Sequence, residues 1–454
     1  MYKRYEEYKD SGIEWIGYIP EHWEMVTLKR RLKVVNGGTP KSEESTFWDD
    51  GNIIWVTPDD LSRNQEKYIY DSKRKITDKG LKNSSASLVP PNSLVVSTRA
   101  PIGYVKITGD KISTNQGCKS LIKRNSDIDE VYYYYSLLFK KDYLNVMGQG
   151  TTFTELSNYN LANCPASLPP YNEQKAISTY LERVDSEIDS LIADKEALIK
   201  KLEEYKQSII TEAVTKGLNP DAKMKDSGVK WVGEIPEHWE IKRLKDFSSI
   251  DRGTADKAIK EDEIKVYLVQ YTNVYYKSVQ RATDGDYLPI TMAVNEFKNS
   301  KVLKGDILLT ASSETPDDIG RSTVIYDELA NHGFGSDILR IRIPENIMVL
   351  NYKKYLIENQ IYLHKLNSLC RGVTRFRFGM NDFKVIRYLI PPIHEQKEIA
   401  DYLDKLVFEV DAIIEATNNQ ISLLNNFRQS LIYEAVTGKI DVRDYQPERS
   451  EQLA

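Results

Sequence analysis

An internal repeat constrains the fold of this chain of 454 residues more than any other feature. Residues 9–24 read KDSGIEWIGYIPEHWE and residues 225–240 read KDSGVKWVGEIPEHWE, with 12 of 16 positions identical. We call these two stretches the leading segments. A second match aligns PPYNEQKAISTYL from Pro169 with PPIHEQKEIADYL from Pro391, and it continues to EAVTKG and EAVTGK. Length alone would predict about three domains, whereas the repeat predicts two tandem copies of one unit.

Each half ends in a stretch with the period of a coiled coil. Apolar residues recur in alternating steps of four and three, and neither stretch contains an internal Pro or Gly. Each therefore predicts one helix of about 44 residues that begins after the Pro-Pro pair. The predicted seam positions are Leu181, Val184, Ile188, Leu191, Lys195, Leu198, Leu202, Tyr205 and Ile209 in the first helix, and Ile399, Leu403, Leu406, Val410, Ile413, Thr417, Gln420, Leu424, Phe427 and Leu431 in the second.

A helix with one apolar seam needs a partner, and the other copy is available. The chain runs from the first body through the first helix to the second body. A second helix that packs on the first and returns therefore predicts an antiparallel pair. Polar Lys195, Thr417 and Gln420 lie near the helix midpoints, where such a pair places them opposite one another. The alternative is that each helix packs only on its own body.

The two bodies, residues 25–166 and 241–387, read as β-rich. They match each other weakly, at Gly37-Gly38-Thr39 with Gly253-Thr254 and at Gly150-Thr151-Thr152 with Gly372-Val373-Thr374. Strands are predicted at 52–57, 93–98, 103–108, 266–270, 306–310 and 338–343, and short helices at 131–139 and 352–363.

The predicted fold class is α+β. Two β-rich domains lie at opposite ends of a long antiparallel two-helix coiled coil and are related by a pseudo-two-fold internal repeat. The predicted parts are the first domain with its leading segment (1–170), the central long helix (171–218), the second domain with its leading segment (219–390), and the C-terminal long helix and tail (391–454).

Several function classes lack their signals in this chain. The three cysteines and five histidines form no disulfide framework and no metal motif. No nucleotide-binding glycine loop and no adenine-methyltransferase tetrapeptide occurs. The absence of a secretory signal and of a long apolar run favours a reducing cytoplasm and no membrane partner.

The net charge of −5 also lacks the basic excess typical of nucleic-acid binders, but the charge divides along the predicted boundaries. Residues 1–170 and 219–390 each carry +2, whereas 171–218 carry −3 and 391–454 carry −6. Residues 371–379 interleave Arg371, Arg375 and Arg377 with two phenylalanines, and such arginines reach phosphates and base edges. The net charge is therefore an average over mildly basic bodies and acidic helices, and it does not argue against DNA binding.

Together, the DSGxxWxGxIPEHW leading segments, the PPxxEQK helix starts and the EAVT helix ends resemble one family. It is the DNA-specificity (S) subunit of type I restriction–modification systems, and the resemblance covers nearly the whole chain. It implies that the bodies are target recognition domains and that the chain has no catalytic activity of its own. It implies as partners double-stranded DNA, two methyltransferase subunits and two restriction-translocation subunits, in the cytoplasm of a bacterium or archaeon. S-adenosylmethionine, ATP and Mg²⁺ are then expected on those partners, and no cofactor or metal on this chain.

On this interpretation each body reads one half of an asymmetric bipartite DNA site, and helix length sets the spacer between the halves. Candidate DNA-contacting residues come from polar loops at strand ends and from basic segments. They are Thr57, Asp60, Arg63, Arg99, Lys119, Thr151 and Thr152 in the first body, and Gln270, Thr272, Asn273, Arg371, Arg375 and Arg377 in the second. The competing interpretation for many of them is that they cap turns.

Two other functions stand as alternatives. The first is a stand-alone DNA endonuclease or methyltransferase with degenerate motifs, for which Glu66-Lys67 after Asp59-Asp60 is a faint nuclease-like hint. The second is a coiled-coil scaffold that never touches DNA. The repeated His22 and His238 predict hydrogen-bonded packing rather than catalysis, because no nucleophile accompanies either one.

Overall fold

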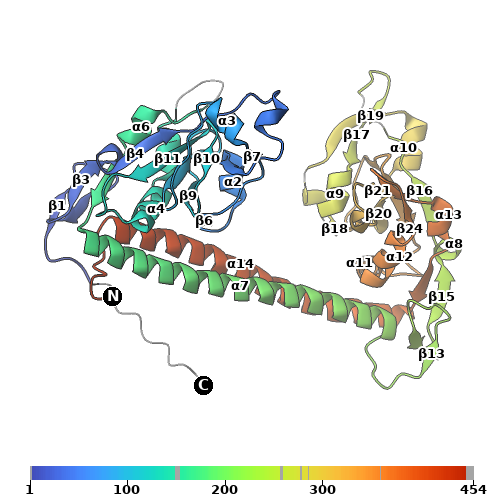
Figure 1. The fold of residues 1–454 in the computed structure, drawn as a ribbon. Helices are drawn as coiled ribbons and strands as arrows, with labels where there is room; N and C mark the ends of the chain where they lie inside the picture. The colour runs from blue at the N-terminus through green and yellow to red at the C-terminus, as the bar shows by residue number, and fades with distance from the viewer. Residues whose placement is uncertain are drawn as a thin grey trace. The chain divides into compact units, whose positions relative to one another are not determined.

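The computed structural model describes residues 3–148, 154–255, 259–276, 279–284, 286–357 and 359–445. The chain divides into two compact units (Figure 1). Unit 1 contains residues 1–195 and 419–454, and unit 2 contains residues 196–418. Each unit therefore holds one β-rich domain and a part of each long helix.

Two sheets form the domain of unit 1. Their strands are β4 (Leu32–Asn36), β5 (Ile53–Val56), β6 (Tyr68–Ile69), β7 (Lys75–Ile76), β8 (Leu94–Ser97), β9 (Val105–Thr108), β10 (Ser113–Thr114) and β11 (Cys118–Lys123). The larger sheet has the order β4-β11-β8-β9-β6 and the smaller one the order β10-β5-β7. Strand β6 is parallel to β9 and β10 is parallel to β5, whereas the other neighbours are antiparallel.

The domain of unit 2 repeats this topology. Its strands are β16 (Ser249–Arg252), β17 (Ile264–Val269), β18 (Val279–Gln280), β19 (Leu288–Met292), β20 (Asp306–Thr310), β22 (Ser322–Ile325), β23 (His332–Phe334) and β24 (Ile338–Arg342). The orders are β16-β24-β20-β22-β18 and β19-β17-β23, with the parallel pairs at the corresponding places. The weak sequence match between the bodies therefore conceals a shared fold.

Short elements complete the two domains. In unit 1 they are β1 (Tyr8–Asp10), β2 (Tyr18–Pro20), β3 (Glu24–Thr27), β12 (Pro165–Leu168), α1 (Leu28–Arg31), a 3-10 turn (Ser45–Phe47), α2 (Pro58–Arg63), α3 (Asp78–Lys82), α4 (Glu130–Phe139), α5 (Lys141–Val146) and α6 (Asn158–Ala162). In unit 2 they are β13 (Met224–Asp226), β14 (Glu234–Pro236), β15 (Glu240–Arg243), β21 (Ser312–Ser313), β25 (Cys370–Arg371), β26 (Phe376–Phe378), β27 (Arg387–Ile390), α8 (Leu244–Phe247), α9 (Tyr271–Tyr276), 3-10 turns (Ala282–Asp284 and Pro316–Asp318), α10 (Val294–Ser300), α11 (Leu350–Ile357), α12 (Gln360–Asn367) and α13 (Met380–Lys384).

The predicted strands of both bodies are confirmed, and so is the helix predicted at 131–139. The single helix predicted at 352–363 is wrong, because the structure has α11 and α12 there. Asn359 caps the start of α12, since its side-chain oxygen accepts a hydrogen bond from the Ile361 amide over 2.9 Å. The apolar pattern runs through this break, so periodicity alone did not reveal it.

The two long helices are α7 (Tyr171–Lys216) and α14 (Ile393–Val436), and within each unit a part of one lies beside a part of the other (Figure 1). In unit 1, Lys195 Nζ donates to Gln420 Oε1 over 2.6 Å and Arg428 pairs with Asp189. In unit 2, Lys206 Nζ lies 2.6 Å from Asp411 Oδ1. Partner numbers fall in one helix as they rise in the other, so the predicted antiparallel pairing is confirmed within each unit. The contact between Lys195 and Gln420 also confirms that these polar positions face each other.

The predicted seam is wrong at alternate positions. In α7, the predicted Leu191, Leu198 and Tyr205 are 49%, 44% and 52% exposed. The half-buried positions are their neighbours Ile192 and Ile199, which continue the stripe begun by Ile188. The same shift of one residue occurs in α14, where Ile413 is exposed and Ile414 is half-buried. The apolar face of each helix is therefore wider than the strip that one partner helix covers.

The repeated motifs hold the leading segment onto the start of the long helix in each unit. In unit 1, Glu173 accepts hydrogen bonds from the Trp23 indole over 2.9 Å and from the Tyr5 hydroxyl over 3.2 Å, and His22 Nε2 lies 2.7 Å from its other oxygen. In unit 2, Glu395 binds the equivalent residues His238 and Trp239 over 2.5 and 2.9 Å. These contacts give both histidines the packing role that the sequence predicts.

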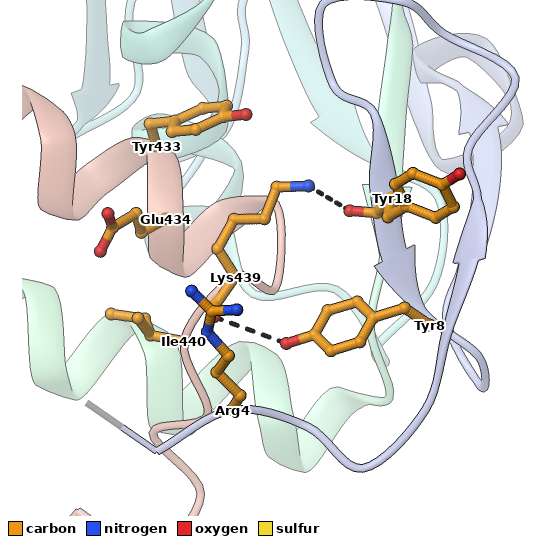
Figure 2. Close-up of a pocket in the computed structure, with 7 residues that line it drawn as sticks. All are labelled: Arg4, Tyr8, Tyr18, Tyr433, Glu434, Lys439 and Ile440. Carbon is orange, nitrogen blue, oxygen red and sulfur yellow. Dashed lines mark hydrogen bonds between the residues drawn. The ribbon is translucent and has the colours of Figure 1, made fainter. Parts of the chain in front are cut away.

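The chain after α14 returns to the first leading segment. Lys439 Nζ donates to the Tyr18 carbonyl, and the Tyr8 hydroxyl donates to the Lys439 carbonyl over 3.5 Å (Figure 2). The amide of Asp441 donates to the Lys3 carbonyl over 2.8 Å. The two ends of the described chain are thus fastened to each other within unit 1.

Candidate nucleic-acid interface

The loop after β5 holds the first group of predicted site residues. The Thr57 amide donates to Asp60 Oδ2 over 2.8 Å and Thr57 Oγ1 accepts from the Asp60 amide over 3.3 Å, which is a capping box that starts α2. Arg63, in the last turn of α2, pairs with Asp59 over 2.9 Å and is mostly exposed. Thr57 and Asp60 therefore have the capping role named as the competing interpretation, and they fix the turn that carries Arg63.

The loop after β17 repeats this geometry in unit 2. The Gln270 amide donates to Asn273 Oδ1 over 2.8 Å, as Thr57 does to Asp60. The Asn273 side-chain amide donates in turn to the Asp286 carbonyl over 3.1 Å. Thr272 is exposed on the first turn of α9. The residues that line a cavity of about 320 Å³ at this loop are Ala255, Leu268, Gln270, Tyr271, Thr272, Gly335, Ser336, Asp337 and Ile338.

The three predicted arginines lie on a hairpin beside this cavity. Arg371 in β25 pairs in register with Arg377 in β26, and Arg377 also pairs with Ser312 in β21. Arg375 Nε donates to Ser312 Oγ over 3.3 Å, and its Nη2 lies 3.4 Å from Asp337 Oδ1. The structure thus brings the arginine hairpin and the loop after β17 together at Asp337.

Sequence reasoning missed Asp337. It lies between β23 and β24, where a lone acidic residue at a strand start has no distinctive pattern. Its place becomes visible only when the cavity and the hairpin are both present. No local signal in the sequence would have found it.

Arg99 and Lys119 meet at a residue that the sequence did not single out, Glu155. Arg99 Nε donates to Glu155 Oε2 over 2.9 Å, and Lys119 Nζ lies 3.7 Å from Glu155 Oε1. Only 7% of the Lys119 side chain is exposed, and this burial lowers its pKa, partly offset by the nearby carboxylate. Lys119 is therefore a buried partner of Glu155, whereas the Arg99 side chain lies at the surface. Thr151 and Thr152 lie outside the described residues.

Glu66 and Lys67, which faintly suggested a nuclease site, make structural contacts instead. Lys67 pairs with Glu182 on α7, and the Glu66 carbonyl accepts a hydrogen bond from Lys106 over 2.6 Å. Within the described ranges, no group of three or more His, Cys, Asp or Glu side chains is placed to hold a metal ion. In the same part of the chain, no helix is long and apolar enough to cross a membrane.

The fold and the site define a class of protein. The two domains share one topology, and each has a capped loop at a strand end and an arginine that is held by a carboxylate. This is the arrangement of a two-domain recognition protein. The chain belongs to the family described as "Type I restriction modification DNA specificity domain", whose pattern matches residues 20–201 and again residues 236–423. The family and the fold that the sequence motifs predicted are thus confirmed.

Relatives and solved structures agree with this assignment. The chain is 27% identical over 445 residues to the type I restriction enzyme MjaIX specificity subunit of Methanocaldococcus jannaschii, covering 96% of this chain and 97% of the relative. It is 23% identical over 446 residues to the EcoBI specificity subunit of Escherichia coli, covering 96% and 90%. A solved structure described as the "structural basis underlying complex assembly and conformational transition of the type I R-M system" has the same fold. It has a TM-score of 0.67 at 16% identity, covering 92% of this chain and 98% of that chain.

Proposed function

We propose that this chain is the sequence-reading subunit of a type I restriction–modification complex, in which each domain binds one half of a bipartite DNA site. One observation carries the proposal. In both units the helix after β5 or β17 starts at a side-chain cap, and a half-exposed arginine is held against a carboxylate, Arg99 against Glu155 and Arg375 against Asp337. A shared frame with different side chains is what two readers of different half-sites require.

Capping supports this role rather than competing with it. The hydrogen bonds of Thr57 with Asp60, and of Gln270 with Asn273, fix the start of α2 and α9 beside the proposed DNA surface. A short helix with a fixed start holds Arg63, in the last turn of α2, and Thr272, in the first turn of α9, without further ordering on binding, which lowers the entropy cost of recognition. The capping residues then hold the helix starts in place, and their exposed neighbours contact DNA.

The exposed apolar faces of the long helices are the proposed docking surfaces for the methyltransferase subunits. Leu198, Phe408 and Leu423 leave large apolar areas in water, which is costly for a helix without a further partner. Because the repeat presents such faces twice, we propose two methyltransferase subunits, with two restriction-translocation subunits in the full complex. Catalysis, S-adenosylmethionine, ATP and Mg²⁺ then belong to the partners, and this chain contributes specificity.

A reconstitution separates this proposal from the enzyme alternative. The purified chain is incubated with DNA, Mg²⁺ and S-adenosylmethionine, with and without its methyltransferase subunit. We expect methylation at one bipartite sequence only when the methyltransferase is present. Methylation or cleavage by the chain alone would favour the stand-alone enzyme.

The scaffold alternative is tested on the arginine hairpin of unit 2. Replacement of Arg371, Arg375 and Arg377 by Ala should weaken DNA binding by the complex and change its salt dependence, because phosphate or base contacts are lost. Arg243→Ala is the matched control, since that exposed arginine pairs with Asp246 over 2.8 Å outside this surface. Unchanged affinity and unchanged salt slope in the triple variant would favour a scaffold.

A further inference from the structure

The two domains can be aligned residue by residue at the proposed DNA surface. The Thr98 amide donates to the Gly117 carbonyl over 2.7 Å, and the Ala311 amide donates to the Asp337 carbonyl over 3.1 Å. Arg99 forms a β-bridge with Glu155, as Ser312 pairs with Arg377. Three pairs of equivalent positions follow: Gly117 with Asp337, Arg99 with Ser312, and Glu155 with Arg377.

Each domain holds one arginine against one carboxylate at this place, but the two domains build the pair from different positions. In unit 1 the arginine is Arg99 and the carboxylate is Glu155, 2.9 Å away. In unit 2 the equivalent of Arg99 is a serine, and the arginine comes from the hairpin as Arg375, 3.4 Å from Asp337. The side chains of Arg99 and Arg375 are 44% and 52% exposed, so both guanidinium groups reach the surface.

The contacts leave donors directed away from the carboxylates. Arg99 uses Nε for Glu155, and Arg375 uses Nε for Ser312 and Nη2 for Asp337. Neither of these contacts involves Nη1 of the arginine, and each Nη nitrogen carries two protons. A planar guanidinium held in this way can still present two parallel donors to one ligand edge.

The neighbouring carboxylates bear on which DNA group each arginine contacts, a backbone phosphate or the edge of a base. In unit 2, Asp337 offsets the positive charge of Arg375 and repels a phosphate. In unit 1, Glu155 is shared by Arg99 and Lys119, so it offsets only part of the positive charge there. A guanine edge presents two neutral acceptors, O6 and N7, at the spacing of the guanidinium fork, and this pair is the commonest specific arginine contact. The carboxylate also orders the side chain before binding, so less entropy is lost in recognition.

We propose that Arg99 and Arg375 each read a guanine, one in each half-site, and that Glu155 and Asp337 are positioning residues for them. This proposal rests on the proposed function, and it adds one base identity to each half of the site. Arg99 lies in the loop after β8, whereas Arg375 lies between β25 and β26, so a sequence alignment at an offset of 222 does not pair them.

The test uses the full complex with its methyltransferase subunits, in cells whose DNA is sequenced for methylated bases. Arg99→Ala should reduce the preference for guanine at one position of the first half-site. Arg375→Ala should reduce the preference for guanine at one position of the second. Loss of a bidentate contact reduces the preference for that base by roughly tenfold to a hundredfold. The half-site that is not touched is the control in each variant, because its retention shows that the complex has folded and assembled.

Conservative variants distinguish base reading from phosphate binding. Arg375→Lys keeps the positive charge but loses the fork, so it should relax the same guanine as Arg375→Ala does. A lysine that restores the guanine preference would overturn the proposal in favour of a phosphate contact. Asp337→Asn and Glu155→Gln should each lower the preference for the corresponding guanine less than the arginine variants do.

The outcomes separate this proposal from the proposed function. If the wild-type complex methylates a bipartite sequence and both Arg→Ala variants keep every base of it, the ion pairs are only structural and the proposal is overturned alone. If the wild-type complex methylates no bipartite sequence, the proposed function fails and the proposal fails with it.

Discussion

Trp23 donates its indole N–H to the carboxylate of Glu173 over 2.9 Å, and Trp239 makes the same bond to Glu395 over 2.9 Å. The next residue in each helix repeats the symmetry. Gln174 accepts from the Asp129 amide over 3.0 Å, and Gln396 accepts from the Val349 amide over 3.0 Å. The Glu-Gln pair therefore joins the leading segment and the domain to the helix start, which explains why these distant motifs recur together in both halves.

Removal of this carboxylate should destabilise each unit. Glu173→Ala leaves the buried Trp23 indole and Tyr5 hydroxyl without their acceptor, and a buried unsatisfied polar group costs about 1–3 kcal/mol. We expect a smaller loss for Glu395→Ala, because Glu395 is more exposed than Glu173. Urea unfolding followed by tryptophan fluorescence measures both. Glu173→Gln, which keeps one acceptor, is the control, and equal stability of Glu173→Ala and wild type would refute this role.

Gly438 ends α14 at a position that excludes a side chain. Its φ of +70° is in the left-handed region, and a Cβ there would lie 2.3 Å from Pro20 Cδ. Gly12 has the same φ of +70°, but a Cβ on this residue would have no heavy atom within 4 Å. Gly12→Ala should therefore cost about 1 kcal/mol from backbone strain alone, and Gly438→Ala should cost more because Pro20 must move. Thermal unfolding of the two variants gives the difference, and equal melting temperatures would show that the helix end adapts.

Lys140 predicts a pH dependence of stability in unit 1. Complete burial lowers the pKa of its ammonium to about 8, although its Nζ donates to the Ser136 carbonyl over 3.0 Å. In the unfolded chain the ordinary lysine pKa is about 10.4, so between these values the unfolded state binds more protons and stability rises with pH. Below about pH 8 both states are protonated and this contribution is constant.

Lys140→Met should therefore remove a rise in stability between about pH 8 and pH 10. Burial raises the pKa of the Cys164 thiol, which acts in the opposite direction, and the charge of Lys140 partly offsets this rise, so both proteins are compared in a Cys164→Ala background. The measurement is accordingly the difference in urea unfolding free energy between these two proteins at several pH values. A difference that does not change with pH would mean that Lys140 is neutral throughout, or as exposed as in the unfolded chain.

The helix seam shows where sequence prediction succeeds and where it stops. Apolar period and the Pro-Pro starts suffice to place two long helices, because those signals are local. Leu191 and Ile192, like Leu198 and Ile199, are adjacent apolar residues, so the period alone does not decide which of each pair faces the other helix. Packing in each unit selects Ile192 and Ile199.

The candidate site divides in the same way. The strand-end loops at Thr57 and Gln270 follow from strand patterns and turn residues close in sequence. The pair of Arg375 and Asp337 does not, since Ser312, Asp337 and Arg375 come from three separate segments that only the tertiary fold brings together. Recognition surfaces of this kind are encoded by topology rather than by a motif.

If each domain reads its own half-site, the domains should be exchangeable. The chain enters and leaves each domain at one hydrogen bond, from the Leu28 amide to the Cys164 carbonyl over 3.0 Å and from the Leu244 amide to the Ile386 carbonyl over 2.9 Å. These equivalent junctions permit replacement of residues 244–386 by a second copy of residues 28–164.

The decisive experiment is to map the methylated sequence in cells that carry this replaced chain with its methyltransferase partner. We expect a symmetric motif in which the second half-site becomes an inverted copy of the first, because the two domains then read the same bases about the predicted two-fold axis. A motif that keeps the original second half-site would show that the domains do not read their half-sites independently, and the proposed function would then be wrong.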